Sequence, residues 1–139
     1  MIQYLLDTDI ASFLMKQYNP MLTHRFRQLS EEDWAISAIS YGELLYGLEP
    51  LPTFHVARAR VANFVGNAKV LDWPSQAAVA YADIRHRTRN QPLNDRDTFI
   101  AAHAIVLDAT LVTNNVRHFS RMGGGLRFEN WLEDSHPGA

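Results

Sequence analysis

The sequence predicts an α/β fold, a three-layer α/β/α sandwich around a central and mainly parallel sheet. Short apolar runs alternate with longer segments in which apolar residues recur at helical spacing. No linker or low-complexity segment interrupts this alternation. The length of 139 residues and the hydrophobic content of 47% suffice for one core and are too small for two. We expect one domain over 1–139, with a core in about 1–132 and a short tail at 133–139.

The first half of the chain predicts two strands, at 2–6 and 34–39, each followed by helices. The helices are expected at about 9–17, 20–29, 40–49 and 54–66. Pro20 suits a first helical turn, where a backbone N–H has no helical partner in any case. The prolines at 50 and 52 end the helix that begins near 40.

The second half continues the alternation. Strands are expected at 69–73, 109–113 and 126–128, and helices at 74–89 and from 95 or 96 to 107. Parallel strands need long crossover connections, which helices supply. The order of elements therefore implies a parallel sheet that is covered by helices on both faces.

Composition excludes several classes of function. The chain has no cysteine, so disulfides and thiolate metal sites are excluded, and its six histidines form no close pair typical of zinc sites. Its start, "MIQYLLDTDI", lacks the basic region of a signal peptide, and no apolar run is long enough to span a bilayer. We expect a cytoplasmic protein that has no membrane partner.

Acidic residues occur where predicted strands end. Asp7 ends the first strand, Glu43 lies in the first turn expected after the second, and Asp97 begins the helix before the strand 109–113. The carboxyl ends of parallel strands share one edge of a sheet, so these acids should meet there, beside Asn115. Converging carboxylates repel one another unless a cation lies between them, and oxygen ligands favour Mg²⁺ or Mn²⁺.

Each acid also has a simpler interpretation as part of a helix start. Asp7 or Asp9 suits the N-cap of the first helix, and "SYGE" at 40–43 suits a capping box. Asp97 suits a first helical turn, three residues after Asn94. Capping does not predict that the acids lie together, whereas a metal site does.

The motifs resemble, as an ordered set, those of the VapC toxins of the PIN-domain family. The set consists of an apolar strand ending in "DTD", then "ISAISYGELLYG", "RDTFIAAHA" where the family pattern is NDxxIAAHA, "LVTNNVRHF" and a closing "GGLRFENW". It runs from Asp7 to Trp131. The resemblance implies an endoribonuclease that depends on Mg²⁺ or Mn²⁺, acts on RNA and is blocked by a VapB antitoxin.

The resemblance assigns metal binding and catalysis to Asp7, Glu43 and Asp97. Thr8 and Thr113 are candidates for hydrogen bonds that orient Asp7 and nearby water. Asn115 stands where many PIN domains have an acid, which leaves a second metal open. Asp9 either restores some of that charge or caps the helix, and we favour the cap.

RNA contacts are harder to read from the sequence. Arg85, Arg87 and Arg89 end a helix, where they suit either a solvated basic terminus or phosphate binding. His103 lies on an apolar helix face and is expected to be a buried structural residue. Exposed apolar helix surface predicts a homodimer.

Two alternatives remain open. The first is a catalytically silent PIN scaffold that binds RNA or a partner without cleaving anything. The second is a haloacid-dehalogenase-like phosphatase, whose D-x-D strand end also resembles "LLDTDIAS". That chemistry needs a downstream lysine and a further acidic pair. The only lysines are Lys16 and Lys69, and "LVTNN" leads to no such pair.

Overall fold

The computed structural model describes residues 1–17 and 19–132, and in this part of the chain five strands form an all-parallel sheet. The expected tail at 133–139 lies outside the described residues. The strand order is β3-β2-β1-β4-β5. The strands are β1 (Tyr4–Leu6), β2 (Trp34–Ser37), β3 (Val70–Leu71), β4 (Thr110–Val112) and β5 (Arg127–Glu129).

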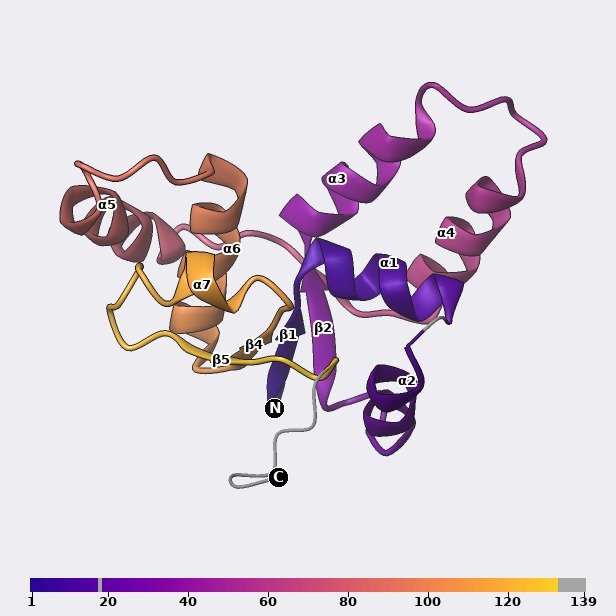
Figure 1. Ribbon diagram of the computed structural model, residues 1–139, viewed down its shortest axis with the longest axis horizontal. Helices are drawn as coiled ribbons and strands as arrows, with labels where there is room; N and C mark the ends of the chain where they lie inside the picture. Colours follow the sequence, from indigo (N-terminus) through magenta and orange to yellow (C-terminus); the bar gives the residue numbers. More distant parts are fainter. Residues whose placement is uncertain (18, 133–139) are drawn as a thin grey trace.

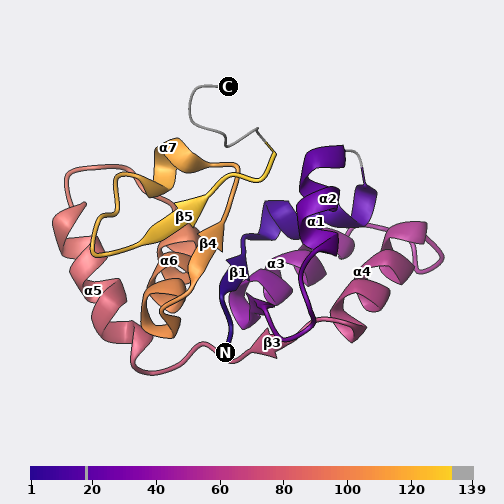
Figure 2. The same ribbon diagram turned by 90° about the horizontal axis from the view of Figure 1, so that it is seen from below.

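Helices cover both faces of the sheet, as the alternation of elements predicts (Figures 1 and 2). One side carries α1 (Thr8–Lys16), α2 (Pro20–Arg27), α3 (Ala38–Leu48) and α4 (Val56–Gly66). The other carries α5 (Ala77–Arg87), α6 (Asp95–Leu107) and the short α7 (Val116–Phe119). In the described residues, no helix combines the length and apolar character needed to cross a bilayer.

Alternation along each strand creates the two cores. Leu6, Ile36 and Val112 pack with α1, α3 and α4, whereas Leu5 and Leu111 pack with α5 and α6. Successive side chains of a strand point to opposite faces, so short strands of consecutive apolar residues can fill both layers. The sheet therefore has a fixed register, with Leu5 paired to Leu111 and Leu6 to Val112.

The strand order also determines where a site can form. The chain moves from β1 to β2 and β3 on one side, and then returns to place β4 on the other side of β1. The order thus reverses between β1 and β4, and ligands of open α/β sheets bind beyond the carboxyl ends of the strands at such a point. Asp7 follows β1 and Thr113 follows β4, so both lie there.

The start of α3 differs from the prediction. The apolar run predicts a strand to 39 and a capping box at Ser40, but α3 begins at Ala38 and its N-cap is Ser37, whose hydroxyl accepts from the Ile39 N–H at 3.1 Å. Ser40 is fully buried inside the helix. The first helical turn is itself packed between sheet and helices, so its apolar residues read as a continued strand. Glu43 consequently lies in the second turn of α3, not the first.

The α3–α4 hairpin is braced by one arginine. The Arg58 guanidinium donates to the carbonyls of Leu48, Leu51 and Pro52 at 2.9, 2.7 and 3.0 Å. Leu48 is the last residue of α3 and the other two residues follow it, where backbone acceptors lack helical partners. Arg58 thereby fixes α4 against α3, and Figure 1 shows the pair projecting beyond the sheet.

Candidate active site

Asp7 is the most deeply buried acid at the carboxyl edge, with 5% of its surface exposed. Its Oδ1 accepts from the Thr8 N–H at 2.7 Å, and its Oδ2 accepts from the Thr113 hydroxyl at 2.8 Å. The Thr113 hydroxyl accepts in turn from the Asn115 N–H at 2.9 Å. Burial raises the pKa of Asp7 from 3.8 to about 7; the Thr113 hydrogen bond opposes this rise and the charge of Asp97 adds to it.

Asp7, not Asp9, is the N-cap of α1. Its backbone is extended, with φ −65° and ψ 157°, and its side chain bonds the first N–H of the helix. Asp9 is an exposed acid of the first turn, so the preference for Asp9 as the cap is wrong. Its charge contributes to raising the pKa of both Asp7 and Asp97, which places it beside the cluster.

Thr8 connects α1 to α3 through its hydroxyl. The hydroxyl donates to Oε1 of Glu43 at 2.7 Å and lies 3.0 Å from the Ser40 hydroxyl. Thr8 therefore holds Asp7 with its N–H and Glu43 with its side chain. The second Glu43 oxygen, Oε2, lies 3.5 Å from Nη1 of Arg96 on α6.

Asp97 faces His118 across the site. Its Oδ2 lies 3.1 Å from Nε2 of His118, on α7. The angle is not that of a hydrogen bond, since this buried nitrogen has no hydrogen-bond partner among the described residues. Burial is the largest cause that raises the pKa of Asp97; the charge of His118 opposes it, and those of Glu43 and Asp9 add to it. The four carboxylates thus lie close enough to influence one another.

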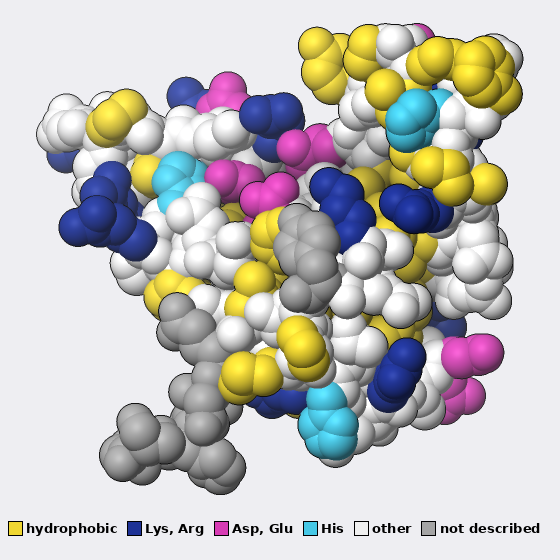
Figure 3. All heavy atoms as spheres, turned by 45° about the vertical axis from the view of Figure 1, so that its right-hand side comes forward, with side chains coloured by type: hydrophobic (Ala, Val, Ile, Leu, Met, Phe, Trp, Pro, Cys, Tyr) yellow, Lys and Arg dark blue, Asp and Glu magenta, His cyan; other side chains and the backbone are white. Residues whose placement is uncertain are grey.

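Figure 3 shows acidic side chains gathered near the middle of one face, with basic side chains and a histidine close by. The donor set consists of carboxylate oxygens, which suit hard divalent cations. Within residues 1–17 and 19–132, no three His, Asp or Glu side chains already surround a common point as ligands would. Thr113 and Thr8 hydrogen-bond Asp7 and Glu43, while Arg96 and His118 lie beside Glu43 and Asp97. The donor chemistry and the mutual repulsion would suit a cation, so Asp7, Glu43 and Asp97 stay the candidate ligands.

Asn115 and His103 are the other polar residues that the sequence singles out. The Asn115 side chain is exposed and makes no capping hydrogen bond to α7, while its N–H donates to the Thr113 hydroxyl that holds Asp7. His103 is buried and shares a 2.9 Å hydrogen bond with the Ser37 hydroxyl, which confirms its structural interpretation. Burial lowers the pKa of His103.

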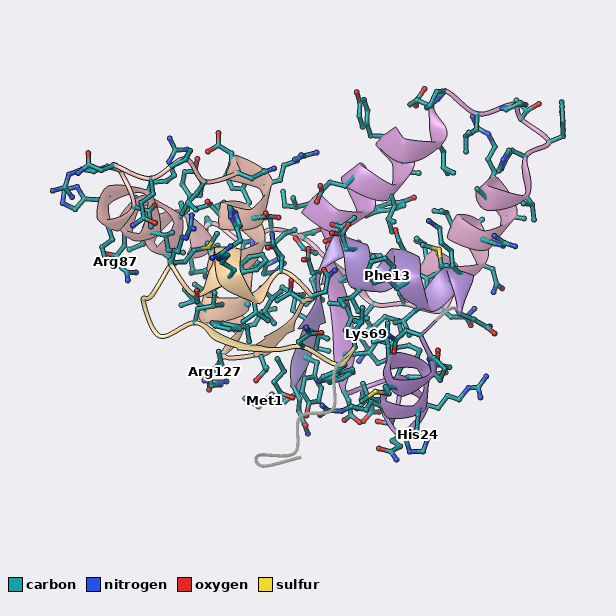
Figure 4. All side chains as sticks on the ribbon, viewed as in Figure 1. Met1, Phe13, His24, Lys69, Arg87 and Arg127 are labelled. Atoms are coloured by element: carbon teal, nitrogen blue, oxygen red, sulfur yellow. The ribbon has the colours of Figure 1, made fainter. Side chains whose placement is uncertain are left out.

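The three arginines predicted to end one helix are all engaged within the protein; Arg85 and Arg87 lie in the last turn of α5, and Arg89 follows its end. Arg85 and Arg87 pair with carboxylates, and Arg89 donates to a backbone carbonyl at 2.7 Å. Their partners are, in order, Asp95, Asp83 and the carbonyl of His86. The Arg87 guanidinium lies against Gly123 and Gly124, and Figure 4 shows Arg87 below α5.

Sequence reasoning missed two side chains of the cluster. His118 depends on α7, a helix of four residues that periodicity cannot detect. Its only signal is its place in the "LVTNNVRHF" motif. From the sequence, Arg96 looks like any charged residue in the first turn of a helix. Only the packing of α6 beside α3 brings it near Glu43.

A groove of about 310 Å³ adjoins the acids between α1, α3 and α4. Thr8 and Glu43 line it together with the apolar side chains of Leu44, Leu48 and Val61. Lys16 and Arg60 also line it. Because Thr8 begins α1 and Lys16 ends it, the groove extends from the acids toward basic residues.

Comparison with known proteins gives relatives of the same size. The PIN domain family matches residues 4–125. The tRNA(fMet)-specific endonuclease VapC of Shigella flexneri is 35% identical over 94% of this chain and 99% of its own length. Ribonuclease VapC2 of Haemophilus influenzae is 31% identical over 95% of this chain and all of its own.

Solved structures agree with these relatives. The DNA-bound VapBC of Salmonella typhimurium matches with a TM-score of 0.85 and 33% identity, over 94% of this chain and 99% of that one. VapBC2 of Rickettsia felis, bound to a DNA fragment from its promoter, matches with a TM-score of 0.83 and 28% identity, over the same shares.

Proposed function

This chain belongs to the VapC family of PIN-domain ribonucleases, and we propose that it is the toxin of a VapBC-type pair that hydrolyses RNA with a divalent metal, Mg²⁺ or Mn²⁺. The observation that carries the proposal is the gathering of Asp7, Glu43 and Asp97, from three different elements, at the switch point of the sheet. Burial and mutual repulsion raise the pKa of Asp7 and Asp97, and such an arrangement of carboxylates does not serve the stability of the fold. Because its substrate would be RNA, we infer that it acts in the cytoplasm.

The residues of the site have two roles, cation binding and the orientation of the cation-binding side chains. Asp7, Glu43 and Asp97 would hold the cation, which lowers the pKa of water and neutralises charge on phosphoryl oxygens when it is bound. Thr113 and the Thr8 N–H fix the rotamer of Asp7, so its oxygens keep their direction. The Thr8 hydroxyl does the same for Glu43.

Cleavage of RNA tests the proposal directly. We expect the purified protein to cut single-stranded RNA with Mg²⁺ or Mn²⁺ present and to stop when EDTA is added. The products should carry a 5′-phosphate and a 3′-hydroxyl, which ligation-based sequencing of the ends identifies. Binding of RNA without any cleavage in either metal would instead support a catalytically silent scaffold.

A VapB-like antitoxin is the expected partner, and the groove between α1, α3 and α4 suits its binding segment. Its apolar lining fits an apolar anchor, and the adjoining acids fit a cation such as arginine. Excess cognate antitoxin should therefore abolish cleavage in the same assay.

We also expect a homodimer. Large apolar side chains remain exposed on the α3–α4 hairpin, among them Tyr46 at 75%, Phe54 at 88% and Val56 at 56%. Such a patch is typical of an interface. Light scattering at micromolar concentration should give twice the mass of the chain. A monomer at that concentration would refute this prediction.

A further inference from the structure

Arg96 places a guanidinium at the rim of the acidic site. It is the second residue of α6 and directly precedes Asp97. Its Nη1 lies 3.5 Å from Oε2 of Glu43, and its Nε lies 3.4 Å from Oδ1 of Asn94, the N-cap of α6. Its side chain is 57% exposed. The guanidinium is thus held beside the acids while it remains open to solvent.

The ion pair that Arg96 makes is weak. Its 3.5 Å separation exceeds those of Arg25, Arg87 and Arg127 from their acids, which are 3.2, 2.6 and 2.9 Å. A long and exposed ion pair contributes little to stability. Arg96 can therefore leave Glu43 for a better anion without cost to the fold.

The helix that carries Arg96 does not require its charge. The side chain adds a full positive charge and a planar set of donors at the edge of the site. Neither is needed to start α6, because Asn94 already caps it by accepting from the Arg96 N–H at 2.8 Å.

We propose that Arg96 is a substrate-binding residue that contacts a phosphate of the RNA strand at the acidic site. The proposal rests on the proposed function, since it takes RNA as the substrate. A phosphodiester that approaches Asp7, Asp9, Glu43 and Asp97 meets a negative field and needs cations at the rim. A guanidinium can bind a phosphate through two parallel N–H donors. The Glu43 carboxylate, 3.5 Å from Nη1 of Arg96, does not engage these donors in that way.

A competing account gives Arg96 only the task of neutralising Glu43. In that case its removal would leave RNA affinity unchanged and would strengthen the binding of divalent cations, because the guanidinium would no longer compete for Glu43. The two accounts therefore predict different results for RNA binding: a loss of affinity if Arg96 contacts phosphate, and no change if it only neutralises Glu43.

The test compares Arg96→Gln, Arg96→Lys and Arg127→Gln with the parent. Arg127 is the matched control, because it is 55% exposed, pairs with Asp108, and lies at the far edge of the fold (Figure 4). Binding of a fluorescein-labelled single-stranded RNA that the parent cleaves is measured in EDTA by anisotropy across a series of salt concentrations. Thermal unfolding midpoints near that of the parent verify that each variant folds.

We expect Arg96→Gln to bind RNA about five- to tenfold more weakly and to reduce the slope of log affinity against log salt by about 0.7, the value for one contact to single-stranded phosphate. Arg96→Lys should keep the slope, because it keeps the charge. Arg127→Gln should match the parent.

Parental affinity and slope in Arg96→Gln would overturn the assignment, and so would an equal loss in Arg127→Gln. A parent protein that neither binds nor cleaves RNA would overturn the proposed function as well. The behaviour of the parent thus distinguishes failure of the proposed function from failure of the Arg96 assignment alone.

Discussion

Asp97→Asn should lower metal-dependent RNA cleavage at least about a hundredfold, equivalent to about 2.7 kcal/mol in the activation barrier. The amide keeps the size and shape of the carboxylate and removes the charge that a divalent cation needs. Asp7→Asn and Glu43→Gln should act in the same way. Because ligands of one site act as a unit, the triple variant should be scarcely worse than any single one.

Stability provides the control for these variants. A neutral residue also suits the first turn of α6, so Asp97→Asn should unfold at or above the parental midpoint. Removal of a repelling charge is expected to favour the folded state. Near-parental cleavage by a well-folded Asp97→Asn would refute its role as a ligand, and near-parental cleavage by all three variants would refute the nuclease proposal.

Without metal, the protein should lose stability as pH rises from about 4 to 8. The pKa of Asp7 is raised from 3.8 to about 7 by burial, so between these values the folded state holds a proton that the unfolded state has released. The free energy of unfolding must then fall as pH rises through this window and level off above it. At 1.36 kcal/mol per pKa unit, the loss amounts to at most roughly 4 kcal/mol.

Urea unfolding in EDTA at pH 5 and pH 8 measures this effect. The amide in Asp7→Asn cannot ionise, so this variant should lose most of the difference in the free energy of unfolding between pH 5 and pH 8. Addition of Mg²⁺ should stabilise the parent more at pH 8 than at pH 5, because a cation favours the ionised carboxylate. A parent whose stability is unchanged or rises over this range would contradict the buried, proton-binding state of Asp7.

The main architecture could be predicted because it depends on local patterns. Alternating short apolar runs and helical periods predict a mainly parallel sheet with helices on both faces, and the structure confirms this with a sheet whose strand pairs are all parallel. Errors arose where burial hides the boundary between elements. The first turn of α3 is as apolar as a strand, and β3 has two residues where five were expected. α7 is too short to have a measurable period.

The site was predictable in outline for the same reason. Asp7 and Thr113 follow strands, so topology alone brings them to one edge, and their 2.8 Å hydrogen bond agrees with the expected contact. The partners of each acid depend instead on side-chain packing between helices distant in sequence. The Thr8 hydroxyl donates to Glu43, and His118 lies beside Asp97, because α1, α3, α6 and α7 meet at this edge. The periodicity of the sequence does not predict these contacts.

Calorimetric titration with Mn²⁺ tests the central claim most directly, because it measures the cation at the acids without RNA. The parent at pH 7 should bind Mn²⁺ and release protons, since Asp7 is part protonated there and must ionise to ligate. Asp97→Asn should bind it at least tenfold more weakly, about 1.4 kcal/mol less favourably. Equal Mn²⁺ affinity in the parent and in Asp97→Asn, or no binding by the parent, would contradict a metal site at Asp7, Glu43 and Asp97.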